Sequence, residues 1–100
     1  MSLEMSIPEL AEALLTGEYV LDVREESEFS RGHVPGAVNI PLGQLSRRLK
    51  ELPAEGHLNV ICQSGVRSLR AAEYLLEEGR EAHSIAGGTA EWIASGGAIE

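Results

Sequence analysis

The chain contains a single cysteine, Cys62, whose neighbours suit reactive rather than structural chemistry. In the stretch NVICQSGVRS, residues 59–68, a short apolar run leads into the cysteine, and small and polar residues and an arginine follow. The thiolate is the nucleophilic form of cysteine, and a helix N-terminus or nearby N–H donors favour it over the thiol. A lone cysteine in a small domain is more often a core residue, but this one lies between a predicted strand and a predicted helix. We therefore interpret Cys62 as a candidate nucleophile.

The loop that follows Cys62 is expected to bind an anion. Ligands of an open parallel sheet lie beyond the carboxyl ends of its strands, and the first N–H groups of a following helix have no partner within that helix. Gly65 allows a tight turn and a close approach of the backbone to a ligand. We therefore expect the loop 62–67 to direct its N–H groups toward one centre and to lower the pKa of the Cys62 thiol.

Strand and helix patterns alternate along the chain, and these elements must position the loop. The predicted strands are short and mostly apolar, and lie at 19–23, 36–41, 58–62 and 81–88. The predicted helices lie at 6–17, 24–32, 42–52, 67–79 and 89–97. Three of the strands lack polar alternation, which is typical of a sheet covered on both faces. The predicted class is therefore α/β with a mostly parallel sheet.

Individual residues support these boundaries. Ser6 and Glu9 have the spacing of a capping box. The leucines of 42–52 recur at intervals of three and four residues, which predicts an amphipathic helix. Thr89 is expected to cap the last helix, and Trp92 is expected to anchor the core rather than contact a ligand.

Length and composition limit the classes of function. A chain of 100 residues predicts one domain over 1–100, of which residues 1–5 are interpreted in part as a cloning remnant because two methionines lie close together there. The net charge of −8 argues against a nucleic-acid partner, and no apolar run is long enough to span a membrane. One cysteine permits neither an internal disulfide nor a cysteine zinc cluster, so we expect no metal and a reducing, cytoplasmic setting.

Three stretches, in this order, resemble the single-domain rhodaneses, a family of sulfurtransferases. The stretch LDVREESEFSRGHVPGAVNIP (21–41) is similar to the first family hallmark, CQSGVRS (62–68) to the active-site loop, and AGGTAEW (86–92) to the closing hallmark. The resemblance implies a three-layer α/β fold with a parallel sheet of about five strands flanked by helices. A short first strand would then precede Ser6, where the residue pattern itself predicts none.

The resemblance also implies a reaction. The Cys62 thiolate would take the outer sulfur of a donor such as thiosulfate, hold it as a persulfide, and pass it to cyanide or a thiol. No cofactor is required. The residues implied to bind the substrate, through N–H groups that hold the charge of the persulfide, are Gln63, Ser64, Gly65, Val66 and Arg67.

Arg67 is open to two interpretations. It could neutralise an anionic donor, or it could pair with Asp22 or Glu28 and fix the loop. We expect Asp22 to support the loop rather than to act as an acid or base. The larger tandem rhodaneses carry a basic residue where this chain has Glu28. Free thiosulfate is therefore expected to be a weak donor, and a persulfide on a partner protein is the alternative donor.

Three other functions remain as alternatives. Phosphatases and arsenate reductases of related fold have a loop one residue longer than the four residues that separate Cys62 from Arg67. A non-catalytic binding or regulatory module is the second alternative, because a fold does not fix a function. A peroxide-sensing thiol is the third, and it would need an external resolving thiol.

Overall fold

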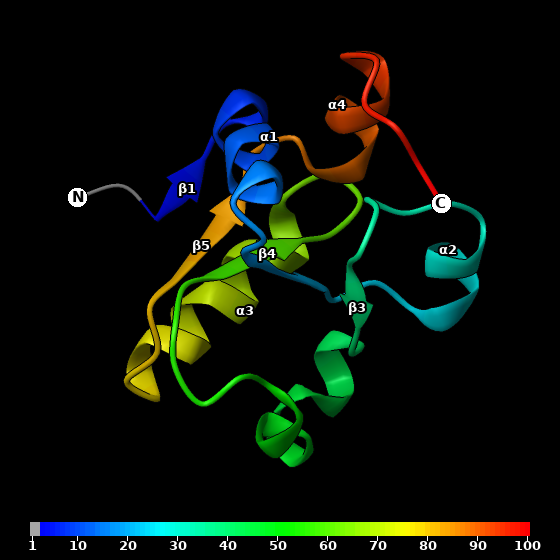
Figure 1. Ribbon diagram of the computed structural model, residues 1–100. Helices are drawn as coiled ribbons and strands as arrows, with labels where there is room; N and C mark the ends of the chain where they lie inside the picture. Colours follow the sequence, from blue (N-terminus) through cyan, green and yellow to red (C-terminus); the bar gives the residue numbers. More distant parts are fainter. Residues whose placement is uncertain (1–2) are drawn as a thin grey trace.

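Five strands form one parallel sheet in the computed structural model, which describes residues 3–100 (Figure 1). The strands are β1 Glu4–Met5, β2 Tyr19–Asp22, β3 Val38–Asn39, β4 Leu58–Ile61 and β5 Ala82–Ile85. Their order across the sheet is β1-β5-β4-β2-β3, so β4 is central. Because all pairs are parallel, the carboxyl ends share one edge, and Cys62 follows β4 at that edge. The predicted α/β class and five-stranded parallel sheet are confirmed.

Helices cover both faces of this sheet (Figure 1). The helices are α1 Ile7–Leu15, α2 Glu26–Ser30, α3 Val66–Glu77 and α4 Gly88–Ala94, with two 3-10 helices, η1 Leu42–Arg47 and η2 Leu49–Glu51. Side chains of the central strand alternate between two core clusters. Val60 and Cys62 belong to the cluster that includes Ala72 of α3, whereas Ile61 packs with Trp92 of α4 in the other. The result is the three-layer arrangement implied by the resemblance.

The N-terminal segment joins the sheet through β1. The Ser84 N–H donates to the Leu3 carbonyl at 2.8 Å, and Glu4 and Met5 pair with β5. This confirms a strand before Ser6. The predicted cloning remnant falls partly on residues 1–2, which lie outside the described residues, while residues 3–5 contribute to the sheet edge.

The capping box of α1 is confirmed. The Ser6 hydroxyl accepts the Glu9 N–H at 3.3 Å, and the Glu9 carboxylate accepts the Ser6 N–H at 2.8 Å. Trp92 is buried, as expected, with 6% of its surface exposed. Within residues 3–100, none of the helices combines the length and apolar character needed to cross a bilayer.

The amphipathic α-helix predicted over 42–52 is wrong in type. The segment forms η1 and η2, which are joined at Arg48 and held by bonds between residues three apart, such as Gln44 N–H to the Pro41 carbonyl at 2.8 Å. Spacings of three residues satisfy a 3-10 helix as well as an α-helix. Leu45 and Leu52 are still buried, so the leucine pattern identified the buried side correctly.

Candidate functional site

Cys62 lies at the junction of β4 and α3, buried at the carboxyl edge of the sheet. Its exposed fraction is 1%. Gly65 ends the loop and caps α3 with φ 101°, a left-handed conformation that favours glycine. A side chain at Gly65 would also meet the Gly87 nitrogen at 3.3 Å and the Ile85 carbonyl oxygen at 3.4 Å. A glycine at residue 65 therefore lets the loop turn back over the cysteine without backbone strain or crowding.

The Cys62 sulfur is surrounded by hydrogen-bonding groups. The Gly65 N–H lies 3.1 Å from Sγ, the Ser68 N–H lies 3.2 Å away, and the Ser68 hydroxyl oxygen lies 3.3 Å away. Burial raises the pKa of the Cys62 thiol, but the bonds from the Ser68 hydroxyl and from the N–H groups of Ser68, Gly65 and Ser64 outweigh it, so the pKa is lowered. This geometry stabilises a thiolate at the end of a central strand.

The predicted loop residues occupy different positions around this sulfur. Ser64 is exposed, and the Val66 side chain is 64% exposed at the start of α3. The Gln63 side chain accepts a hydrogen bond from Arg24 Nη1 at 3.2 Å. Ser68 was not among the predicted site residues, because its position after the arginine carries no signal until α3 is placed against the sheet.

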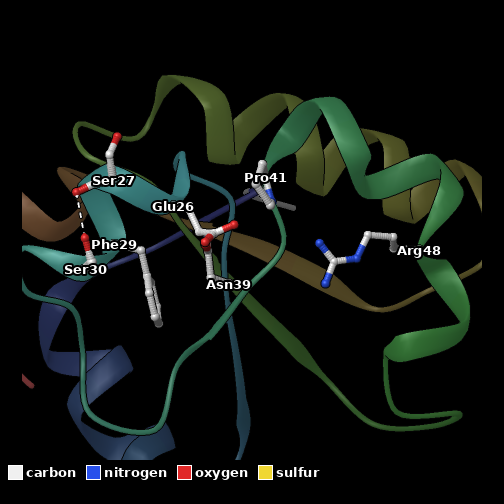
Figure 2. A pocket seen from close by; sticks show the side chains of 7 residues that line it. All are labelled: Glu26, Ser27, Phe29, Ser30, Asn39, Pro41 and Arg48. Atoms are coloured by element: carbon white, nitrogen blue, oxygen red, sulfur yellow. Dashed lines mark hydrogen bonds between the residues drawn. The ribbon is translucent and has the colours of Figure 1, made fainter.

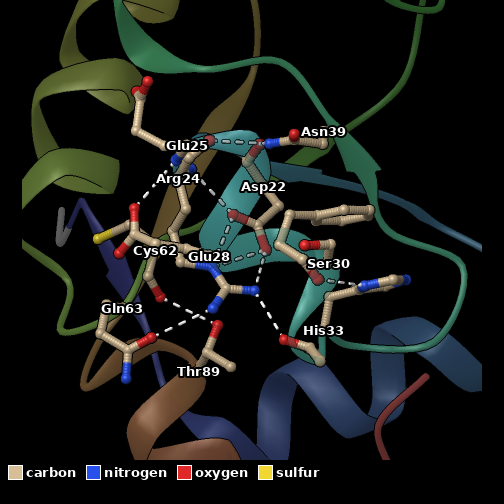
Figure 3. Close-up of polar contacts among 12 residues, drawn as sticks. Asp22, Arg24, Glu25, Glu28, Ser30, His33, Asn39, Cys62, Gln63 and Thr89 are labelled. Atoms are coloured by element: carbon tan, nitrogen blue, oxygen red, sulfur yellow. Dashed lines mark hydrogen bonds and ion pairs between the residues drawn. The ribbon is translucent and has the colours of Figure 1, made fainter.

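The first turn of α4 fixes the other side of the loop. The Cys62 carbonyl accepts the Thr89 N–H at 2.8 Å and the Thr89 hydroxyl at 3.1 Å (Figure 3). Gly88 has φ 59°, and a Cβ there would lie 2.4 Å from the Cys62 carbonyl oxygen. The predicted N-cap role of Thr89 is wrong, because Gly87 is the N-cap and Thr89 lies inside the helix. The double glycine thus allows α4 to approach the loop after Cys62 closely.

A buried ion pair lies beside the loop, at the carboxyl end of β2. Asp22 is fully buried and accepts bonds from Arg24 Nε at 3.1 Å and Nη2 at 2.9 Å (Figure 3). Arg24 also donates to the Gly32 carbonyl at 2.9 Å and to Gln63. Asp22 therefore reaches the loop through Arg24, which bonds to Gln63.

Arg67 pairs with Glu28 and not with Asp22. Its two terminal nitrogens lie 2.7 Å and 2.9 Å from the two Glu28 carboxylate oxygens. The hydrogen bonds from Arg67 hold the pKa of Glu28 down at about 2. Since both partners are about a third exposed, solvent screening limits the energy of the pair. Of the two interpretations of Arg67, the structure contains the one in which Arg67 pairs with a carboxylate. This pair links α3 to α2.

Glu28→Gln should lower stability modestly at neutral pH and less so in acid. The folded pKa of Glu28, about 2, is below its ordinary 4.5. The stabilisation is therefore present above pH 4.5 and is lost as the pH falls toward 2. Melting temperatures of the wild type and the variant should converge below pH 4.5, with Glu55→Gln on an exposed loop as control. A gap that stays constant throughout this range would contradict the role of the ion pair.

Two hollows flank α2, and only one adjoins the loop. The larger, about 690 Å³, has no residue of the Cys62 loop in its wall (Figure 2). Its lining residues are Glu26, Ser27, Phe29, Ser30, Asn39, Pro41 and Arg48. The smaller, about 380 Å³, is bounded by Gln63 and Thr89 of the site and by Arg24, Glu28 and Arg31. Position relative to the cysteine, rather than size, makes the smaller hollow the candidate substrate site.

Two histidines, His57 and His83, lie away from the cysteine. His57 and His83 lie 2.7 Å apart through ring nitrogens, and Glu18 accepts from His57 at 2.8 Å. They lie toward the amino ends of β4 and β5, at the edge opposite Cys62. Among residues 3–100, no group of three or more His, Cys, Asp or Glu side chains is placed to hold a metal ion.

Comparison with known proteins gives a consistent family match. The family model described as "Rhodanese-like domain" matches residues 6–95. The chain is 34% identical over 91 residues to the putative sulfurtransferase YtwF of Bacillus subtilis, covering 89% of this chain and 88% of that protein. It is 43% identical over 74 residues to the uncharacterized protein YqhL of the same organism, and there it covers 73% of this chain but only 59% of YqhL.

Solved structures agree with this match. A crystal structure of a rhodanese-related protein from Thermoplasma volcanium has a TM-score of 0.91 and 32% sequence identity. The similarity covers 97% of this chain and 96% of that one. The fold is therefore shared along nearly the whole chain.

Proposed function

Because this chain belongs to the family of rhodanese-like domains, we propose that it is a sulfurtransferase in which Cys62 carries the transferred sulfur. The observation that supports this most strongly is the pair of N–H donors at 3.1 Å and 3.2 Å from Sγ, with the Ser68 hydroxyl at 3.3 Å, which favours a charged sulfur in a buried site. A reactive cysteine needs such an electropositive environment, whereas a structural one does not.

The proposed reaction has two half-reactions. The Cys62 thiolate attacks the outer sulfur of thiosulfate, a new S–S bond forms, and the old S–S bond breaks with its electron pair leaving on sulfite. The product is a Cys62 persulfide anion. Cyanide or a thiolate then attacks the terminal sulfur, the S–S bond to Cys62 breaks, and the Cys62 thiolate returns. Each step forms one bond to the transferred sulfur and breaks another, with no net gain or loss of electrons, so the scheme calls for no external oxidant or reductant.

Loop residues have distinct proposed roles in this scheme. The Gly65 N–H, together with the N–H groups of Ser64 and Ser68, stabilises the charge on sulfur. The Gln63 side chain, oriented by Arg24, lines the entrance. Because Arg67 is already bound to Glu28, it holds the loop in place rather than supplying an unpaired charge to the donor.

The donor can be proposed from the charges of the smaller hollow. Arg24 is paired with Asp22 there, Glu28 adds a carboxylate, and Arg31 is the remaining cation of the wall. With a net charge of −8 on the chain, a dianion such as thiosulfate is attracted weakly. We propose that a persulfide presented by a partner protein is the better donor, and that the protein acts in the cytoplasm, where its thiol stays reduced.

Steady-state assays of thiocyanate formation test this proposal. With thiosulfate and cyanide as substrates, the double-reciprocal plots should be parallel, as expected for two half-reactions that share one enzyme form. The wild type should not turn over p-nitrophenyl phosphate or arsenate, because the loop between Cys62 and Arg67 is one residue shorter than in the phosphatases. Phosphate-ester hydrolysis without sulfur transfer would favour that alternative instead.

A further inference from the structure

Two buried serines continue the hydrogen bonding of the sulfur into the core. Ser68 of α3 and Ser84 of β5 are both fully buried. Their hydroxyl oxygens lie 2.7 Å apart, and the Ser68 oxygen is also 3.3 Å from Cys62 Sγ. The Ser84 hydroxyl in turn lies 3.5 Å from the Gly65 carbonyl oxygen. A line of polar atoms therefore runs from Sγ through two hydroxyls to the backbone of the loop.

The line of polar atoms begins at Cys62 Sγ and returns to it through Gly65. The same Gly65 whose carbonyl accepts from Ser84 donates its N–H to Cys62 Sγ at 3.1 Å. The surroundings are apolar, because Val60, Ala71 and Ala72 belong to the same buried cluster as Cys62. A buried hydroxyl costs free energy unless it is hydrogen bonded, so alanine at either position would suit packing alone. Packing therefore does not explain why two serine hydroxyls lie in line with the Cys62 sulfur, and their chemistry can.

Each hydroxyl has one hydrogen, so the line can be ordered in two directions. In the thiol form, Cys62 donates to Ser68, Ser68 donates to Ser84, and Ser84 donates to the Gly65 carbonyl. In the thiolate form the proton of Cys62 has left to solvent, Ser84 donates to Ser68, and Ser68 donates to the sulfur anion. Reversal requires only rotation of two hydroxyl hydrogens, and every heavy atom keeps its place.

We propose that Ser68 and Ser84 form a reversible hydroxyl chain that satisfies Cys62 in both protonation states and directs a reinforced hydrogen bond at its thiolate. Ser68 is then a catalytic residue, because it contacts the reacting sulfur. Ser84 is a positioning residue that acts through Ser68, since a donor bonded to a hydroxyl strengthens the bond which that hydroxyl donates. The proposal deepens the proposed function and rests on Cys62 being its nucleophile.

Charged groups near the sulfur are already occupied by other partners. Arg67 on α3 is paired with Glu28 on α2, and Asp22 is paired with Arg24 after β2. Substituting either serine leaves these pairs in place. A change in the titration of Cys62 in the serine variants would therefore report the hydroxyl chain itself.

The test is a titration of thiolate ultraviolet absorbance, with Cys62→Ser as the blank for the two tyrosines, and Cys62 is the one thiol that contributes. Ser68→Ala should move the midpoint to higher pH and lower the thiolate population below the midpoint about tenfold, since it removes a hydrogen bond to a charged group. Ser84→Ala should lower the same thiolate population roughly threefold. The double variant should titrate like Ser68→Ala, and Ser46→Ala, an exposed serine of η1, should titrate like the wild type.

The double variant separates this proposal from a merely structural pair. An unchanged titration midpoint in Ser84→Ala would overturn the proposal. A further shift of the midpoint when Ser84→Ala is added to Ser68→Ala would also overturn it. Melting temperatures identify variants that fail to fold, and Ser84→Ala alone decides the matter if Ser68→Ala does not fold. The readout needs no sulfur donor, so absence of sulfur transfer in the wild type would refute the proposed function without altering the titration.

Discussion

Cys62→Ser is expected to abolish sulfur transfer while leaving the fold intact. A serine hydroxyl is not ionised at neutral pH and cannot form a persulfide, so transfer to cyanide should fall at least about a thousandfold, as when other catalytic nucleophiles are removed. The serine oxygen can still accept the N–H groups of Gly65 and Ser68, which now bond to Sγ. The melting temperature should therefore stay close to that of the wild type.

Thiocyanate formation and thermal unfolding check this prediction together. Ser46→Cys, which places a thiol on the exposed surface of η1 in the Cys62→Ser background, is a matched control, and it should not restore activity. If Cys62→Ser retained even about a tenth of wild-type activity, Cys62 would not be the sulfur carrier.

Asp22→Asn should destabilise the protein strongly and disturb the loop as well. The substitution leaves the Arg24 guanidinium, 3% exposed, without its counter-charge. Breaking a buried ion pair from one side costs about 3–5 kcal/mol, because a buried charge is left uncompensated. Since Arg24 also holds Gln63 and the Gly32 carbonyl, sulfur transfer should fall by more than the fraction of unfolded protein explains.

Chemical denaturation and initial rates measure these two effects. Glu51→Gln is the matched control, because it removes the acidic partner of Arg48 in an exposed pair with N–O distances of 2.7 Å and 2.8 Å. Little change in stability is expected there, since exposed ion pairs contribute little. If Asp22→Asn lost no more stability and activity than the control, the buried pair would not support the loop.

Local features could be predicted from the sequence because neighbouring residues determine them. Ser6 and Glu9 are three residues apart, and Gly65 directly precedes the helix that it caps. Strand β1 was implied only by the family resemblance and not by the residue pattern, because two residues carry no period and the strand exists only through its pairing with β5. The prediction for residues 42–52 was wrong in the type of helix, because leucines three residues apart fit both an α-helix and a 3-10 helix.

The candidate site could be predicted only as far as its loop. The choice of Glu28 over Asp22 as the partner of Arg67 depends on Arg24 occupying Asp22, which sequence spacing does not reveal. The pairing of Ser68 with Ser84 depends on the packing of α3 against β5, because Ser68 lies on the helix and Ser84 on the strand. Such contacts between distant segments appear only in the folded chain.

The intact mass of the protein after incubation with a sulfur donor tests the central claim most directly. With thiosulfate, and separately with a persulfide donor, the mass should increase by one sulfur atom, the added sulfur should map to Cys62, and dithiothreitol or cyanide should remove it. A mass increase with the persulfide donor alone would identify the class of donor and would still support sulfur transfer through Cys62. No gain with either donor, in protein whose Cys62 still reacts with an alkylating reagent, would contradict sulfur transfer through this cysteine.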